Sequence, residues 1–119
     1  MELLYVDDEP SLLELGKEFL ELEPDVSVTT RLNPVEALAL LNDKHFDIIV
    51  SDYMMPEMTG LELAREILAI RADIPIIMCT GFSHLVDADA AQAAGIKTFV
   101  MKPLTRREIA KTIRKVLEG

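Results

Sequence analysis

The segment Asp47-Ile48-Ile49-Val50-Ser51-Asp52 decides the fold class, because it joins a continuous apolar run to a carboxylate at its end. Short, nearly continuous apolar runs are typical of strands in a sheet that is covered on both faces. The chain contains four further strand-like runs, of which Ile74–Met78 and Thr98–Met101 have the same continuous character. We predict strands at Leu3–Asp7, Val26–Thr30, Phe46–Ser51, Ile74–Cys79 and Thr98–Met101.

Helix signals lie between these runs. Asn33-Pro34 reads as an N-cap followed by a proline at the first helical position. A fourth helix, about His84–Ala94, is alanine-rich and only weakly amphipathic, and Gly95 suits its end. The capping-box pattern is present at three places: Ser11–Glu14, Thr59–Glu62 and Thr105–Glu108. Strands that alternate with helices predict an α/β fold, with a parallel sheet and helices on both of its faces.

The carboxyl ends of parallel strands are where such sheets build their binding sites. Four of the five predicted ends carry charged or hydroxyl side chains, namely Asp7-Asp8-Glu9, Asp52, Thr80 and Lys102-Pro103. Any one of these residues alone is more plausibly an ordinary loop or cap residue. The combination at four separate strand ends favours a site.

Three carboxylates at one edge repel each other, so one of them must take up a proton unless a cation lies between them. Mg²⁺ suits such a group, since it takes one or two carboxylates, keeps several waters and completes its shell with phosphate oxygens. Lys102 adds a positive charge for a phosphoryl oxygen, and Thr80 adds a hydroxyl donor. An aspartate beside a bound Mg²⁺, a lysine and a hydroxyl group can act as a nucleophile toward phosphorus.

The residues that carry this chemistry also carry a family resemblance. Leu4–Pro10, Asp47–Gly60, Cys79-Thr80-Gly81 and Phe99–Pro103 together resemble the response-regulator receiver domain of two-component signalling. The resemblance covers essentially the whole chain. It implies a flavodoxin-like, doubly wound (βα)5 fold, whose five-stranded parallel sheet has the order 2-1-3-4-5.

By this resemblance, Asp52 accepts a phosphoryl group from a phosphohistidine in a reaction that depends on Mg²⁺ or Mn²⁺. Asp8 and Asp52 would bind the metal directly, Asp7 would hold it through water, and the backbone carbonyl of Met54 would add a further oxygen. Lys102 would contact the phosphoryl group, and its peptide bond to Pro103 is expected to be cis.

The resemblance also implies a conformational switch and two kinds of partner. Thr80 would move toward the phosphoryl oxygens, and the ring of Phe99 would move inward into the space that it leaves. A histidine kinase or a histidine phosphotransfer domain would be the phosphoryl donor, and the first helix would dock the kinase. A downstream protein or an attached domain would read the face formed by the fourth helix, the fifth strand and the fifth helix.

Composition narrows the class of protein further. A chain of 119 residues with a formal net charge of −9 is expected to form one domain, 1–119, with no output domain after the last helix. No apolar run approaches the roughly 20 residues that cross a bilayer, and no secretory signal is visible. We therefore expect a cytoplasmic protein without direct membrane contact, and the acidic balance argues against direct nucleic-acid binding. The single cysteine, Cys79, is expected to be a small buried residue.

Charge is distributed unevenly between the first and the last helix. The first is rich in glutamate and the last in arginine and lysine, which suits either solvated helix faces or a docking role. The first helix also has more apolar residues than one buried stripe needs, so some of them are expected to be exposed: Leu12, Leu13, Leu15, Phe19 and Leu20. His45 and His84 are expected to be surface or cap residues.

Four alternatives remain at this point. A flavodoxin-type FMN site would bring a phosphate against Asp7-Asp8-Glu9, which would repel it. A phosphatase of the haloacid-dehalogenase type needs a second aspartate two residues after the nucleophile, where this chain has Met54, so we expect no enzyme turnover. Beside a stand-alone regulator that accepts a phosphoryl group, the chain could be a receiver excised from a hybrid sensor histidine kinase, or a receiver-like scaffold that is never phosphorylated.

Overall fold

The computed structural model describes residues 1–53, 55, 58–80, 95–96, 98–101 and 106–118. The predicted helix at His84–Ala94 lies outside these residues, as does Thr105 of the third predicted capping box. Within the described part, the strands are β1 (Glu2–Val6), β2 (Ser27–Arg31), β3 (Ile48–Asp52), β4 (Ile76–Thr80) and β5 (Thr98–Met101). The helices are α1 (Pro10–Glu21), α2 (Pro34–Asp43), α3 (Gly60–Ile70) and α5 (Arg106–Glu118).

The five strands form one parallel sheet of order β2-β1-β3-β4-β5. This confirms the predicted architecture and strand order. Most strand bounds differ from the predicted ones by one or two residues. The prediction followed apolar composition, whereas the hydrogen-bonded ladder continues into polar residues such as Asp52 and Thr80.

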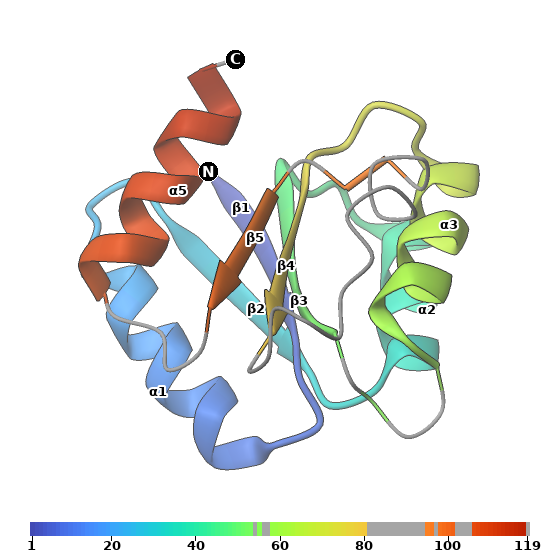
Figure 1. Cartoon of the computed structure of the whole chain (residues 1–119), viewed down its shortest axis with the longest axis horizontal. Coiled ribbons are helices and arrows are strands. Elements are labelled where there is room, and N and C mark those ends of the chain that lie inside the picture. Colours follow the sequence, from blue (N-terminus) through green and yellow to red (C-terminus); the bar gives the residue numbers. More distant parts are fainter. Residues whose placement is uncertain (54, 56–57, 81–94, 97, 102–105, 119) are drawn as a thin grey trace.

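Each face of the sheet is covered by helices, with α1 and α5 on one side and α2 and α3 on the other (Figure 1). Successive residues of a strand point to opposite faces, so a continuous apolar run supplies both cores. Ile49 packs in the cluster beneath α2 and α3, while Ile48 and Val50 pack in the cluster beneath α1 and α5. All three side chains are fully buried.

Two of the predicted helix starts are confirmed and one is wrong. The Asn33 side chain accepts a hydrogen bond from Glu36 N–H at 2.8 Å, and Thr59 and Glu62 form a reciprocal capping box. The Ser11–Glu14 pattern does not cap α1, which begins at Pro10 with Glu9 in the N-cap position, two residues before the predicted N-cap Ser11. Proline is well suited to the first helical position, since its fixed φ is helical and no N–H is lost there.

Gly95 has a φ of +90°, as suits the residue that follows a helix end. Cys79 is fully buried, as predicted. Of the helices that the structure describes, none combines the length and apolar character that crossing a bilayer requires.

Ile67 and Ile70 allow a matched test of the core beneath α3, because one side chain is fully buried and the other is 39% exposed. We expect Ile67→Ala to lower the free energy of unfolding by about 2–5 kcal/mol, through lost burial and a cavity. Ile70→Ala should cost less than about 1 kcal/mol. Urea denaturation followed by circular dichroism measures both, and equal losses would contradict this packing.

Candidate metal and phosphoryl site

Three aspartates meet at the carboxyl edge of the sheet. β1 and β3 are neighbours, and their register pairs Val6 with Ser51. The next residues, Asp7 after Val6 and Asp52 after Ser51, therefore lie side by side. One carboxylate oxygen from each of Asp7, Asp8 and Asp52 can be chosen so that all three lie within 4.8 Å of one another. The convergence predicted from the strand ends is therefore confirmed.

The three side chains differ in their access to solvent. Asp7 is fully buried and Asp52 is only 7% exposed, whereas Asp8 is exposed. Asp7 is held in place locally: its Oδ1 accepts the Glu9 N–H at 3.0 Å, and its own N–H donates to the Arg31 carbonyl at 3.2 Å. The site is thus a pair of fixed, buried carboxylates with a third at the solvent boundary.

Two backbone hydrogen bonds fix the loop after Asp52: one joins it to β4 and the other joins its two ends. Tyr53 N–H donates to the Cys79 carbonyl at 2.9 Å, and Gly60 N–H donates to the Tyr53 carbonyl at 2.7 Å. A Cβ on Gly60 would lie 3.0 Å from Tyr53 Cα and 2.9 Å from Met78 Cε, so this close approach requires a glycine. Met55 is buried and Met58 is partly buried against the same core, so both side chains pack the loop onto it.

The structure places only some of the remaining predicted site residues. Thr80 is the last residue of β4, and its backbone pairs with Met101 of β5. Phe99 pairs with Met78, and its partly buried ring packs against the cluster beneath α2 and α3. Met54, Lys102 and Pro103 lie outside the described residues.

A buried phenol lies beside the site on the α1 side of the sheet. Tyr5 is 2% exposed, and its burial raises the pKa of the phenol well above its ordinary value. Electrostatic interactions with Cys79, Asp7 and Asp52 act in the same direction. The neutral tyrosine therefore contributes shape and a phenol hydroxyl, and no charge. The sequence gives little sign of it beyond Gly16, whose missing side chain leaves room on α1 for the Tyr5 ring.

His45 and Asp47 lie at the opposite edge of the sheet, at the start of β3. Asp47 accepts the Glu2 N–H at 2.7 Å, and this bond, with help from His45, holds the pKa of the carboxyl below its ordinary value. The His45 side chain is exposed and contacts Asp47 and Arg71. These residues are therefore structural, which confirms the surface role predicted for His45; His84 lies outside the described residues.

The donor set suits a hard divalent cation. Carboxylate oxygens are the ligands that Mg²⁺ and Mn²⁺ prefer, and three of them within 4.8 Å can share one ion. The open position at Asp8 leaves room for water or for a phosphate oxygen. The acidic cluster is thus consistent with metal binding.

Comparisons with known proteins agree with this geometry. The family model described as "Response regulator receiver domain" matches residues 3–114. The transcriptional regulatory protein GlrR of Escherichia coli is 36% identical over 116 residues, which are 98% of this chain and 26% of GlrR. The response regulator SaeR of Staphylococcus aureus is 35% identical over 115 residues, 97% of this chain and 50% of SaeR. The chain therefore spans only a quarter to a half of the length of these curated relatives.

A solved structure of the response regulator protein TrrA from Thermotoga maritima, in complex with Mg²⁺-BeF, superposes with a TM-score of 0.87. It is 33% identical and the match covers 97% of each chain. That structure is a magnesium complex of a protein with the same fold and a similar sequence.

The crowding of the three carboxylates predicts a stability change. We expect Asp8→Asn to raise the melting temperature in EDTA at low ionic strength, because it removes one of three mutually repelling charges. The gain should shrink as salt screens the repulsion. Scanning calorimetry measures it, with Glu9→Gln as the control, since Glu9 is exposed and outside the cluster. An equal gain in the control would show that the effect is one of net charge.

Proposed function

The chain belongs to the response regulator receiver domain family, and we propose that it accepts a phosphoryl group on Asp52 from the phosphohistidine of a histidine kinase or of a histidine phosphotransfer domain. The observation that carries this proposal is the group of three carboxylates within 4.8 Å, one of which ends the central strand β3. Such a module works where histidine kinases present their phosphohistidine, in the cytoplasm.

Asp52 is the nucleophile in this proposal. One carboxylate oxygen forms a bond to phosphorus as the bond between phosphorus and the imidazole nitrogen breaks, and the electron pair goes to that nitrogen. Asp52 is 7% exposed and fixed at the end of a hydrogen-bonded strand, so its carboxylate is already oriented when the donor arrives. Lys102 and the Thr80 hydroxyl are assigned to the phosphoryl oxygens, as the resemblance implies.

Asp8 and Asp52 are the residues that we propose to hold Mg²⁺ or Mn²⁺ directly, with Asp7 acting through water and the Met54 carbonyl as a further ligand. A bound divalent ion supplies positive charge that offsets the carboxylates and the phosphoryl oxygens. The Glu9 N–H keeps Asp7 aimed at the cluster, so the carboxylate at the buried end of the site does not turn away.

The proposed output is a change at β4 and β5. Thr80 ends β4, and Phe99 lies on the adjacent strand with a ring that is neither fully buried nor fully exposed. New hydrogen bonds between Thr80 and the phosphoryl group would favour the packing in which the Phe99 ring is inside. The reader of this change is a downstream protein or a domain attached in the same polypeptide, as in a hybrid kinase.

Sustained hydrolysis is not part of the proposal. A phosphatase of the haloacid-dehalogenase type needs a second aspartate two residues after its nucleophile as general acid or base, and that position in this chain is Met54. We therefore propose a signalling module that helps its own phosphorylation and is not an enzyme in its own right.

Phosphorylation of Asp52 is tested with acetyl phosphate as donor. We expect the wild type to gain one phosphoryl group in Mg²⁺, seen by intact-mass spectrometry, and to lose the gain in EDTA. Asp52→Asn should abolish the gain, because an amide is not a nucleophile toward phosphorus. Asp47→Asn is the matched control, since Asp47 lies at the other end of β3, and it should be phosphorylated like the wild type. Unchanged phosphorylation of Asp52→Asn would disprove the assignment.

The switch is tested by separating phosphorylation from its readout. Thr80→Val keeps the side-chain shape but lacks the hydroxyl, so we expect Asp52 to be phosphorylated while the Phe99 ring resonances shift little. Thr80→Ser keeps the hydroxyl and should retain most of the shift. Nuclear magnetic resonance with beryllofluoride and Mg²⁺ measures these shifts. A full shift in Thr80→Val would show that the ring responds without the hydroxyl.

A further inference from the structure

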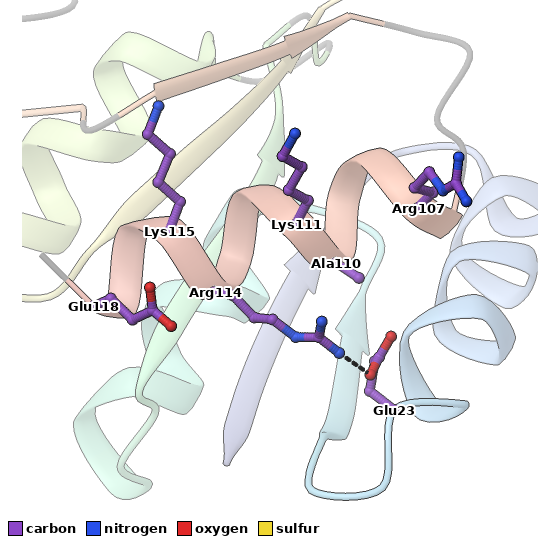
Figure 2. A pocket seen from close by; sticks show the side chains of 7 residues that line it. All are labelled: Glu23, Arg107, Ala110, Lys111, Arg114, Lys115 and Glu118. Atoms are coloured by element: carbon purple, nitrogen blue, oxygen red, sulfur yellow. Dashed lines mark hydrogen bonds and ion pairs between the residues drawn. The ribbon is translucent and has the colours of Figure 1, made fainter.

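The outer faces of α1 and α5 carry opposite charges. On α5, the basic face consists of four exposed cations at helical spacing, which line an open groove of about 940 Å³ (Figure 2): Arg107, Lys111, Arg114 and Lys115. On α1, the acidic face consists of Glu14, Glu18 and Glu21, all exposed. The two helices are neighbours on the same side of the sheet (Figure 1).

These charges are largely unused within the chain. Among the described residues, the one ion pair on the basic face joins Arg114 to Glu23 at 2.5 Å, and Lys111 and Lys115 extend on the side of the helix away from Glu23 (Figure 2). Glu21 accepts the Val28 N–H at 3.0 Å. Within the same part of the chain, Glu14 and Glu18 have no ionic partner.

Helix stability does not account for the acidic face. Glu18 and Glu21 lie in the last turn of α1, where the helix dipole disfavours negative charge, and that turn has no basic residue. On α5 the dipole does favour a cation in the last turn, where Lys115 lies. Glu18 and Glu21 are therefore placed against the preference of their own helix, and Glu14 and Glu18 have no ionic partner among the described residues, which together point to an external partner.

Exposed leucines accompany the charges. Leu12 and Leu15 of α1 are 40% and 46% exposed, which confirms that some of the apolar residues of this helix are not used in the core, while Leu13 and Leu20 are buried. Leu117 of α5 is 43% exposed. Apolar side chains with charges around them are the usual composition of a protein–protein interface.

We propose that the chain self-associates through a two-fold interface in which the acidic face of α1 in each copy packs on the basic face of α5 in the other. α1 and α5 lie next to each other, so a two-fold axis running along the helices, between them, brings each α1 onto the partner's α5. An axis across the helices would instead oppose like charges. Charge complementarity therefore selects one symmetric arrangement, in which both unlike pairs form at once.

The interface is small and depends on charge. It uses one face of two helices, 12 and 13 residues long, so its area is at the lower end for stable complexes. Association is therefore expected to be weak, reversible and sensitive to salt. A dimer of this kind covers α1, the helix expected to dock the kinase, so self-association competes with phosphotransfer.

The test uses two charge-reversed variants of the 119-residue chain. Glu14→Lys/Glu18→Lys makes both faces basic, and Arg107→Glu/Lys111→Glu/Lys115→Glu makes both faces acidic. We expect wild type to form dimers in sedimentation equilibrium at low salt, and each variant alone to associate at least about tenfold more weakly. A one-to-one mixture of the variants should dimerise again, because every α1–α5 contact is then between unlike charges. Both variants keep a net negative charge, so general attraction does not explain such rescue.

Arg65→Glu/Glu66→Lys reverses two exposed charges on α3, at the other face of the sheet, and should associate like wild type. Loss of the dimer in about 1 M salt, where the Debye length is about 3 Å, would support the charge pairing. A wild type that stays monomeric up to millimolar concentration at low salt would overturn the proposal. Dimers that both reversed variants retain, or a mixture that fails to recover them, would overturn it equally.

Discussion

The repulsion among Asp7, Asp8 and Asp52 is the constraint on which the rest of the structure depends. Like charges within 4.8 Å separate unless the backbone that carries them is held firmly. Here the backbone of two of them continues from neighbouring strands of a sheet with apolar clusters on both faces, and the ladder fixes their relative position. The apolar core therefore holds three acidic side chains close together, and a local arrangement of this kind, which packing alone would not favour, is typical of functional sites.

Much of the fold is predictable from sequence because its strands are buried on both faces. Continuous apolar runs such as Ile48-Ile49-Val50 occur in few other settings, and their alternation with helices implies a parallel sheet. Local sequence signals predicted the helix start correctly where no other signal competes, as at Asn33. They failed where two signals for a helix start overlap. At the start of α1, Pro10 determines the first helical residue, so the Ser11–Glu14 pattern lies one position inside the helix.

The members of the acidic part of the site are predictable from the sequence, whereas the contacts that support them are not. Parallel strands end at one edge, so the meeting of Asp7, Asp8 and Asp52 follows from the fold class. The hydrogen bonds that orient these carboxylates come from backbone groups, such as the Glu9 N–H that donates to Asp7. Every residue except proline has a backbone N–H, so the sequence does not indicate which one will donate. The closure of the loop at Gly60 likewise depends on how near Tyr53 and Met78 come in three dimensions.

The net charge of −9 combines three arrangements that have different causes. The buried carboxylates are held by the sheet, and the cations of α5 agree in part with the helix dipole. Glu14 and Glu18 of α1 have neither explanation, since no described cation pairs with either of them and Glu18 opposes the dipole of its own helix. A charge that stabilises neither the helix nor the core acts most effectively between molecules, where it selects partners and orientation. The surface charge of this domain is therefore best understood as part of its recognition chemistry.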